Sequence, residues 1–562
     1  MGQAHPAMSP SCLSGLKGNQ AGDVLVQVDS VIARRGPIPI SGRYTCSGRI
    51  EDDYTVEDKV LGSGLSGPVL LAASKVDAKQ YAVKSFKKSG LSSRLRAELR
   101  NEAELYLTLD HPHVARLEMV YETDDDLQMV MEYMQGGELY DRLAQRKQYT
   151  EEGAAATAYQ MLLAVAYLHA HKVAHRDLKL ENFLYQDRTG DHLKLIDFGF
   201  AKFWDPTTKM SQSCGSLHYV APEVLAHSYT TQADMWSLGI IMYMLLTGTT
   251  PFRGSEEQIA MKIKSGNPYY CSRFFKLSEQ AQAFVRALLV HNPARRLTAS
   301  AALEHPWVMR RNRAQDTFIG QDILASLRSF ARASHFRRVV LSMMAWSLST
   351  EDVADLREQF LFMDLDKRGT ITLSELRQTL QERFHVDGAE AQALFESLDT
   401  DNDQEIEYHE FLAGVLLGRV RAHEDMLRKT FARFDRSRTG MISCQDLRSV
   451  LGDTFDGVDL KELMREADTK GDGKIDYDEF IACLYDPEPA CAGPPVARSG
   501  SLRDVKPEQV GTVIDRLVAK GMSDPDSEKP VSRTASCLSG MPILLGSQLR
   551  GDKAVEPRRR KP

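Results

Sequence analysis

Four stretches of twelve residues between positions 364 and 479 repeat one spacing of acidic side chains, and this repeat restricts the fold more than any other feature. They start 35, 36 and 33 residues apart, and each has an apolar residue at its eighth position. We number them loop 1 (364–375), loop 2 (399–410), loop 3 (435–446) and loop 4 (468–479). Apolar residues at helical spacing flank the loops. The repeat therefore predicts an all-α module of helix–loop–helix units.

The loops have the donor pattern of calcium sites. Such loops present oxygens at positions 1, 3, 5, 7, 9 and 12, with a glycine at position 6. One acidic loop alone is more often a solvated connection between helices, but four at nearly constant spacing favour calcium binding and resemble two EF-hand pairs, as in calmodulin. The predicted calcium ligands are Asp364, Asp366, Thr370, Glu375, Asp399, Asp401, Asp403, Glu405, Glu410, Asp435, Asp468, Asp472, Lys474 and Glu479.

None of the four loops has the complete pattern, and we rank them for calcium binding in the order 2, 4, 1, 3. Loop 2 is the most acidic, although Gln404 replaces its turn glycine, which costs roughly 1 kcal/mol if the backbone must adopt positive φ. Loop 4 has Lys470 at position 3, and loop 1 has Arg368 at position 5. Loop 3 is the poorest, because Ser437 replaces an acid and the shorter Asp446 stands at position 12.

A second set of motifs, earlier in the chain, suits the chemistry of phosphate groups. The glycine-rich run 62–69 follows the start of an apolar strand, and glycines at this spacing let backbone N–H groups approach phosphate oxygens. Alone, the run would indicate a plain turn. It is followed in order by Ala-Val-Lys at 82–84, His-Arg-Asp-Leu-Lys-Leu-Glu-Asn at 175–182, Asp-Phe-Gly at 197–199 and Ala-Pro-Glu at 221–223. This order makes a chance origin very improbable.

Hydrophobic periodicity places these motifs in a domain with two unequal lobes. The pattern is strand-like from residue 54 to residue 86 and helical from 93 to 109. Long helical patterns dominate after residue 151, including 157–170 and 233–246. A strand-rich start followed by a helix-rich bulk predicts an α+β domain.

The ordered motifs resemble those of a eukaryotic protein kinase over residues 54–308. In that family, metal ions neutralise the phosphates of ATP and a carboxylate orients the attacking hydroxyl. The resemblance implies that Asp177 is the base, Lys179 steadies the transferred phosphate and Lys84 holds the α- and β-phosphates. It also implies that Asn182 and Asp197 hold Mg²⁺.

Further positions follow from the same resemblance. Glu102 is expected to pair with Lys84, with Glu104 as the alternative, and Glu223 with Arg296 is expected to form a structural ion pair. The predicted ATP-binding residues are Leu61, Gly62, Ser63, Gly64, Leu65, Ser66, Gly67, Val69, Ala82, Lys84, Glu132 and Met134.

Two positions depart from the common kinase pattern. Ser66 stands at the tip of the glycine-rich loop, where many kinases have an aromatic residue. Gln212 stands two residues before Cys214, where kinases activated by phosphorylation usually have threonine. Because glutamine cannot be phosphorylated, activation by a phosphate on this segment is disfavoured.

Glu138 and Glu181 match kinase positions that bind an arginine three residues before the phosphoacceptor. The predicted substrates are therefore proteins with that arginine. The tail has two such sequences, which predict autophosphorylation at Ser501 and Ser536 because Arg498 and Arg533 precede them by three residues.

Charge is unevenly distributed between the two modules. Residues 351–486 have a net charge of −15, of which −11 lies in 351–420, whereas residues 309–349 carry seven arginines against two aspartates. The basic segment also has apolar residues at helical spacing, Ile323, Leu327 and Phe330, then Phe336, Val340 and Met343. This is the composition of a helix that binds calmodulin, although a helix packed permanently on the kinase lobe is the alternative.

The whole order resembles the calcium-dependent protein kinase family of plants and protists. The resemblance implies that the junction inhibits the kinase and that calcium-loaded EF-hands release it. The predicted domains are a flexible leader (1–53), the kinase (54–308), the junction (309–349), a calmodulin-like domain (350–486) and a mostly disordered tail (487–562). A related kinase whose degenerate EF-hands no longer regulate it is the alternative. A scaffold without activity is disfavoured because no catalytic position is lost.

Composition limits the other possibilities. The sequence has no strongly basic region of the kind that binds nucleic acids, and nucleic-acid binding is therefore not predicted. No apolar stretch reaches the ~18 residues of a membrane helix. Eight cysteines without a CxxC pair suit a reducing cytoplasm, where we expect the protein to reside. Gly2 and Cys12 suggest acylation, but Pro6 stands where the myristoylation pattern requires serine or threonine. Membrane association is therefore only weakly supported.

Overall fold

A computed structural model of the 562-residue chain describes residues 41–46, 48–64, 67–212, 214–310, 320–348, 353–419, 424–455 and 457–485. Leu65 and Ser66 at the tip of the glycine-rich loop, Gly2, Cys12, Ser501 and Ser536 lie outside these ranges. Among the described helices, none combines the length and apolarity needed to cross a lipid bilayer.

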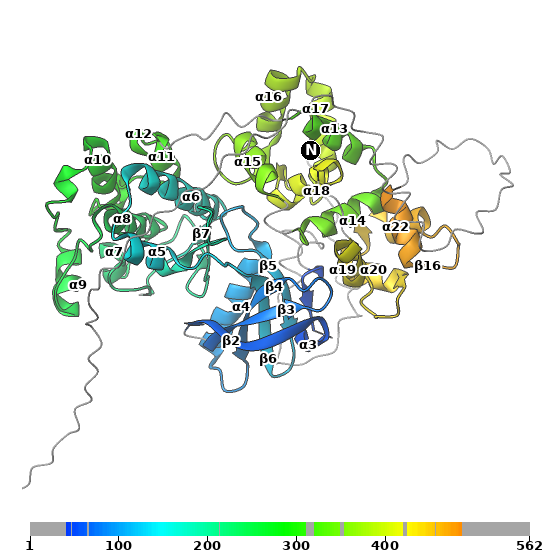
Figure 1. Ribbon diagram of the computed structural model, residues 1–562, viewed down its shortest axis with the longest axis horizontal. Helices are drawn as coiled ribbons and strands as arrows, with labels where there is room; N and C mark the ends of the chain where they lie inside the picture. Colours follow the sequence, from blue (N-terminus) through cyan, green and yellow to red (C-terminus); the bar gives the residue numbers. More distant parts are fainter. Residues whose placement is uncertain are drawn as a thin grey trace, which may run out of the picture. The chain divides into compact units, whose positions relative to one another are not determined.

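The smaller lobe of the kinase domain is a six-stranded sheet in the order β1-β5-β6-β4-β3-β2. Its strands are β1 (Tyr44–Thr45), β2 (Tyr54–Gly64), β3 (Gly67–Ser74), β4 (Gln80–Lys87), β5 (Leu117–Glu122) and β6 (Asp126–Glu132). Figure 1 shows helix α4 (Ser93–Thr108) beside this sheet. The Ser92 hydroxyl accepts a hydrogen bond from the backbone N–H of Leu95 and caps the helix. A smaller apolar cluster, which includes Tyr54, Tyr81 and Tyr121, packs on the strands.

Residues 41–53, predicted to belong to a flexible leader, instead contribute to the folded lobe. Strand β1 pairs in parallel with β5, and helix α3 (Ile50–Asp53) precedes β2. Arg43 is fully buried and donates to the carbonyl oxygens of Leu107 (2.6 Å) and Leu117 (3.1 Å). Sequence patterns could not predict this strand, because two residues are too few to show a periodicity.

The larger lobe is built around two apolar helices, α6 (Glu151–Ala170) and α8 (Gln232–Thr247), as the periodicity predicted. Gly239 lets α8 approach α10 closely, because a Cβ there would lie 2.9 Å from the Leu288 side chain. The other elements are α5 (Leu139–Arg146), β7 (Val173–Ala174), β8 (Phe183–Tyr185), β9 (Leu193–Leu195), β10 (Lys202–Phe203), α7 (Pro222–Leu225), α9 (Glu256–Lys264), α10 (Glu279–Leu288), α11 (Ala299–Leu303) and α12 (Pro306–Met309).

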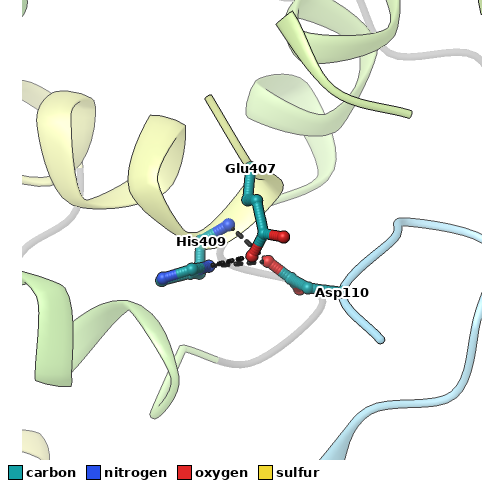
Figure 2. Close-up of side chains that lie close together, drawn as sticks. All are labelled: Asp110, Glu407 and His409. Atoms are coloured by element: carbon teal, nitrogen blue, oxygen red, sulfur yellow. Dashed lines mark hydrogen bonds and ion pairs between the residues drawn. The ribbon is translucent and has the colours of Figure 1, made fainter. Parts of the chain in front are cut away.

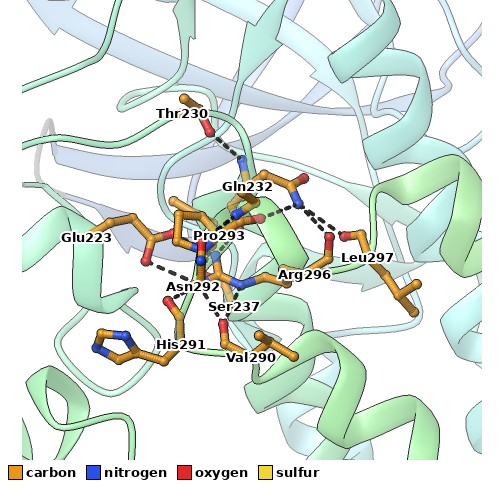
Figure 3. A network of polar contacts seen from close by, with 12 residues as sticks. Glu223, Thr230, Gln232, Ser237, Val290, His291, Asn292, Pro293, Arg296 and Leu297 are labelled. Atoms are coloured by element: carbon orange, nitrogen blue, oxygen red, sulfur yellow. Dashed lines mark hydrogen bonds and ion pairs between the residues drawn. The ribbon is translucent and has the colours of Figure 1, made fainter.

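The expected ion pair between Glu223 and Arg296 joins helix α7 to the segment between α10 and α11. Arg296 donates to both carboxylate oxygens of Glu223, at 2.6 and 3.1 Å, and to the carbonyl oxygen of Val290. Figure 3 shows these contacts together with the Gln232 amide, which donates to three carbonyl groups. The buried pair positions α7 and has no catalytic contact of its own.

The C-terminal module consists of two pairs of helix–loop–helix units. Within each pair the eighth loop residues face each other in a short ladder, Ile371 with Ile406 and Ile442 with Ile475. The first pair comprises α15 (Ala354–Met363), β11 (Ile371–Thr372), α16 (Leu373–Phe384), α17 (Gly388–Leu398), β12 (Glu405–Ile406) and α18 (Tyr408–Arg419). The second comprises α19 (Glu424–Phe434), β13 (Ile442–Ser443), α20 (Cys444–Leu451), β14 (Thr454–Phe455), β15 (Val458–Asp459), α21 (Leu460–Ala467), β16 (Lys474–Ile475) and α22 (Tyr477–Tyr485).

The junction forms two helices, α13 (Gln321–Ala331) and α14 (His335–Ala345), whose apolar faces are buried in this module. Helix α13 packs against α17 and α18, and α14 packs against α18, α19, α21 and α22. Charged contacts supplement the apolar ones: Arg328 donates to Glu390 at 2.6 Å and the Phe336 backbone N–H donates to Glu466 at 2.8 Å.

The junction ends in an aromatic stack. The Trp346 ring, only 1% exposed, lies with its centroid 3.6 Å from the Arg43 guanidinium carbon and 4.7 Å from the His409 ring centroid. Within the described part of the chain, its indole N–H has no hydrogen-bond partner. Three separate segments, the end of the leader, the junction and the helix after loop 2, therefore meet at this indole.

Candidate active site and calcium loops

Lys84 stands at the centre of the kinase cleft, between α4 and the Asp-Phe-Gly motif. Its Nζ lies 2.7 Å from Glu102 Oε1 and 3.1 Å from Asp197 Oδ1. Burial alone would lower the pKa of Lys84, but the two carboxylates raise it above its usual value. The structure thus pairs Lys84 with Glu102 and decides against the alternative, Glu104.

The Asp-Phe-Gly motif turns Asp197 toward this lysine. Asp197 has a φ of 64°, a region that non-glycine residues rarely occupy, and its backbone N–H donates to the Tyr106 hydroxyl at 3.0 Å. Phe198 is fully buried and packs edge-on against Tyr106 and also against His175. Packing of the phenylalanine inside the lobe leaves the Asp197 carboxylate in the cleft, where a metal ligand is needed.

The catalytic segment brings three predicted residues together. Lys179 Nζ lies 2.6 Å from Asp177 Oδ2, and the Asn182 amide donates to the Asp177 carbonyl oxygen at 2.8 Å. The other carboxylate oxygen of Asp177 accepts from the backbone N–H and the hydroxyl of Ser216, at 2.9 and 3.0 Å. Donors on both oxygens fix the carboxylate in one orientation.

Asp234 supports this segment from α8 and was missed by the sequence reasoning. Its buried carboxylate accepts from the backbone N–H groups of His175 (3.0 Å) and Arg176 (2.8 Å) and contacts His169 at 2.9 Å. Arg176 has a φ of 69°, so these contacts also hold a strained backbone. No local motif marks Asp234, because its role depends on a contact 58 residues away.

Arg176 of the catalytic segment forms hydrogen bonds with two other segments of the larger lobe. It donates to the Phe200 carbonyl oxygen at 2.6 Å and to the Tyr229 hydroxyl at 3.3 Å. Tyr229 in turn donates to the carbonyl oxygen of Gln212 at 2.7 Å. Arg176 is thus linked through Tyr229 to the backbone of Gln212.

The predicted ATP-binding residues line the strands around Lys84. Val69 pairs with Lys84 across β3 and β4, and Ala82 pairs with Met131 across β4 and β6. The Glu132 side chain is held by Lys194 at 2.7 and 2.9 Å. The Glu132 backbone N–H donates to the Arg116 carbonyl oxygen at 3.1 Å.

The two carboxylates predicted to bind arginine lie near each other. Burial raises the pKa of Glu138, and the charges of Asp141 and Glu181 add to the shift. Glu181 Oε2 is buried and has no hydrogen-bond partner among the residues that the structure describes. A buried carboxylate oxygen with no donor, beside a second acid, favours a cationic ligand.

Loops 1 and 2 each bring several carboxylates close together. Asp364, Asp366 and Glu375 cluster in loop 1, as do Asp399, Asp401 and Asp403 in loop 2. Burial, with repulsion from neighbouring acids, raises the pKa of Asp364 to about 7. Burial also raises the pKa of Glu410. Oxygen ligands alone, at these positions, fit Ca²⁺.

In loops 3 and 4, as in loops 1 and 2, groups of the chain itself contact the acids. In loop 4 the Lys470 ammonium contacts Asp476 and lies 3.9 Å from Glu479. In loop 3 the Ser437 hydroxyl donates to Asp446 at 3.1 Å. Hydrogen bonds lower the pKa of Asp476 and, against the effect of burial, that of Asp446.

The expected order of the loops stays a prediction. In loop 1 Arg368 lies 3.1 Å from the predicted ligand Asp366, and in loop 4 Lys470 contacts Asp476 and lies 3.9 Å from Glu479. The sixth positions all have positive φ, 83°, 72°, 79° and 79° in chain order. Gln404 therefore does bear the backbone strain expected of a non-glycine residue in loop 2.

Loop 2 also contacts the kinase. Figure 2 shows Asp110, Glu407 and His409 side by side. Asp110 accepts from the backbone N–H (2.6 Å) and Nδ1 (3.0 Å) of His409, and Glu407 lies 3.5 Å from the same ring nitrogen. Although burial would raise the pKa of Asp110, the His409 contacts hold it at about 2. Position 11 of loop 2 is thus bonded to the kinase beside the predicted calcium ligand Glu410.

Comparison with known proteins agrees with this geometry. The protein kinase domain profile matches residues 55–308, and the EF-hand domain pair profile matches 353–416 and 424–485. The chain is 36% identical to calcium-dependent protein kinase 7 of Arabidopsis thaliana over 434 residues, which are 75% of this chain and 81% of that protein. It is also 36% identical to calcium-dependent protein kinase 3 of Oryza sativa subsp. japonica over 458 residues, covering 80% and 83%. The chain belongs to the calcium-dependent protein kinase family.

Membership in the calcium-dependent protein kinase family confirms the predicted architecture, a two-lobed kinase domain followed by an all-helical EF-hand region. It also confirms the predicted serine/threonine protein kinase activity, with ATP and Mg²⁺ for the kinase and Ca²⁺ for the EF-hands. Protein substrates follow from the same membership. The roles of single residues rest on the geometry above.

Proposed function

We propose that this kinase is inhibited by its junction and is released when calcium-loaded EF-hands bind the junction helices. Two observations, taken together, support the proposal. The apolar faces of α13 and α14 are covered by EF-hand helices, while Lys84, Glu102 and Asp197 are in contact in the cleft. A junction covered in this way cannot also occupy the cleft. This favours an active arrangement over permanent packing of the junction on the kinase lobe.

We propose the following catalytic roles. Asp177 orients the substrate hydroxyl and accepts its proton, because both of its oxygens are already held by Ser216 and Lys179. Asn182 and Asp197 would hold Mg²⁺, which neutralises phosphate charge when bound with ATP. Lys84, fixed by Glu102, grips the α- and β-phosphates.

Loops 1 and 2 are the proposed calcium switch. Their buried carboxylates repel one another, and Glu410 already bonds to the Thr400 N–H and hydroxyl at 2.8 and 2.7 Å. Helix α18 follows loop 2 directly and packs on both junction helices. A change in the geometry of Glu410 is therefore passed to the junction through one continuous helix.

We further propose substrates with arginine three residues before the phosphoacceptor. Glu138 and the unpartnered oxygen of Glu181 support this preference. The matched test compares two peptides that differ only by arginine or alanine at that position. Glu181→Gln should reduce the preference by about tenfold, since a buried charge-assisted hydrogen bond contributes roughly 1.5–3 kcal/mol.

The experiment that tests the whole proposal measures phosphate transfer from Mg-ATP to a basic peptide, with Ca²⁺ and with a chelator. We expect activity only with Ca²⁺, and Asp177→Asn should remove nearly all of it. Equal activity in chelator would support the alternative, a related kinase that its degenerate EF-hands do not regulate. No activity in either condition would contradict the assigned catalytic roles.

A further inference from the structure

The third EF-hand combines a poor calcium loop with an unusually basic surface. We define hand 3 as α19, loop 3 and α20. Inside loop 3, the Ser437 hydroxyl lies 3.3 Å from Asp435 and 3.1 Å from Asp446, and it links the acids at positions 1 and 12. Asp446 also accepts from the Ser443 N–H at 2.9 Å. The two acids that a cation would need are therefore bonded to each other through the chain.

Two basic residues of α19, Lys429 and Arg433, converge on one buried acid of the kinase sheet. Lys429 Nζ lies 2.6 Å from Glu118 Oε1 and donates to the Tyr81 hydroxyl at 2.8 Å. Arg433 donates to the same Glu118 oxygen. Burial would raise the pKa of Glu118, but Lys429 and Arg433 hold it at about 2. All three charged groups are at most 10% exposed at the side chain, so water screens them little.

Loop 3 adds two more arginines on the same side. Arg438 lies 3.3 Å from Asp52 and 3.3 Å from Asp53, both on α3. Arg436 donates to the carbonyl oxygen of Ser41. In a calcium loop, such cations would oppose the ion, whereas here each one meets an acceptor of the smaller kinase lobe.

We propose that hand 3 is a docking element for the smaller kinase lobe in place of a calcium site. Its partner is the acidic surface formed by Glu118 on β5 and by Asp52 and Asp53 on α3 of the same chain. This goes beyond the proposed release of the junction, which requires only that EF-hands bind α13 and α14. Docking keeps the EF-hand module on the kinase sheet, and it does so without an ion in loop 3.

Hydrogen–deuterium exchange on the full chain tests the docking. Glu118→Gln should speed the exchange of α19 amides by about tenfold, because the docked helix then opens more easily. Arg428→Gln is the matched control, since Arg428 lies beside Lys429 but pairs with Glu424 of its own helix and is 60% exposed. The control should leave the exchange unchanged. Unchanged α19 exchange in Glu118→Gln would overturn the proposal.

A charge-reversal experiment distinguishes the loss of docking from misfolding of the variant. Glu118→Lys should expose α19, and adding Lys429→Glu with Arg433→Glu should restore its protection. Failure of the triple variant to restore protection would also contradict the docking contact. Neither result depends on kinase activity, so this test can fail while the proposed calcium release stands.

Calorimetric titration with Ca²⁺ tests the second half of the proposal. Asp435→Asn should leave the number of bound ions unchanged, whereas Glu410→Gln in loop 2 should reduce it by one. Loss of one ion in Asp435→Asn would show that loop 3 is a calcium site and overturn the proposal.

Discussion

Removing the largest apolar side chain of α14 should uncouple calcium from activity. Phe336 is fully buried, and α14 packs against helices of both EF-hand pairs. Phe336→Ala deletes the ring and leaves a cavity at this contact. The catalytic residues are untouched, because the substitution lies in the junction.

The magnitude follows from the burial. Phenylalanine-to-alanine changes at fully buried positions cost about 3–5 kcal/mol. Each ~1.4 kcal/mol is a factor of ten in an equilibrium constant. If the whole loss falls on the contact between junction and EF-hands, the balance shifts by about two to three orders of magnitude toward the free junction. The midpoint of calcium activation should therefore rise by at least about tenfold.

The assay is peptide phosphorylation across a calcium titration, with Ser329→Ala as the control, since Ser329 is an exposed residue of α13. Circular dichroism should show that both variants are folded. An activation curve for Phe336→Ala that coincides with that of the native protein would refute the idea that EF-hand binding of α14 releases the kinase.

Three further outcomes are expected. Asp197→Ala should lower phosphate transfer by at least about a thousandfold, because a metal ligand is lost from the transition state; near-native rates would contradict its role. Glu410→Gln should move the midpoint of calcium activation to higher calcium and Asp446→Asn should not, and a larger effect of the loop 3 change would reverse our order of the loops. Incubation with Mg-ATP and Ca²⁺ should place phosphate on Ser501 or Ser536, as mapped by mass spectrometry with Asp197→Ala as control; phosphate only on sites without an upstream arginine would argue against the predicted preference.

The catalytic cleft could be predicted from sequence because its residues stand in motifs at fixed offsets. Lys84 and Asp197 are 113 residues apart, yet each lies in a short motif whose chemistry is specific, and the structure places them 3.1 Å apart. The calcium loops were predictable for a similar reason, since the repeat fixes the spacing of their acids. In both cases the residues predicted to carry the function also form a short local pattern in the sequence.

The contacts between modules could not be predicted in this way. Glu118 and Arg433 are 315 residues apart, and neither stands in a motif, so their ion pair depends entirely on tertiary packing. The contact made by Lys470 was also out of reach: at position 3 it was expected to remove a ligand and add a repelling charge, and its long side chain reaches Asp476 within the same loop. A sequence pattern records which groups are present, but not the direction in which a flexible side chain turns.

The stacked indole at the end of the junction gives the molecule a built-in optical reporter. Of the four tryptophans in the chain, Trp346 is the one that follows the kinase domain. Its ring contacts the guanidinium of Arg43 and the imidazole of His409, and an imidazole quenches indole emission on contact. Departure of the junction from the EF-hands would separate the ring from His409 and expose it to water, so its emission should brighten and shift to the red. The position of the junction can therefore be followed by tryptophan fluorescence, in the unlabelled protein, on the timescale of a single calcium pulse.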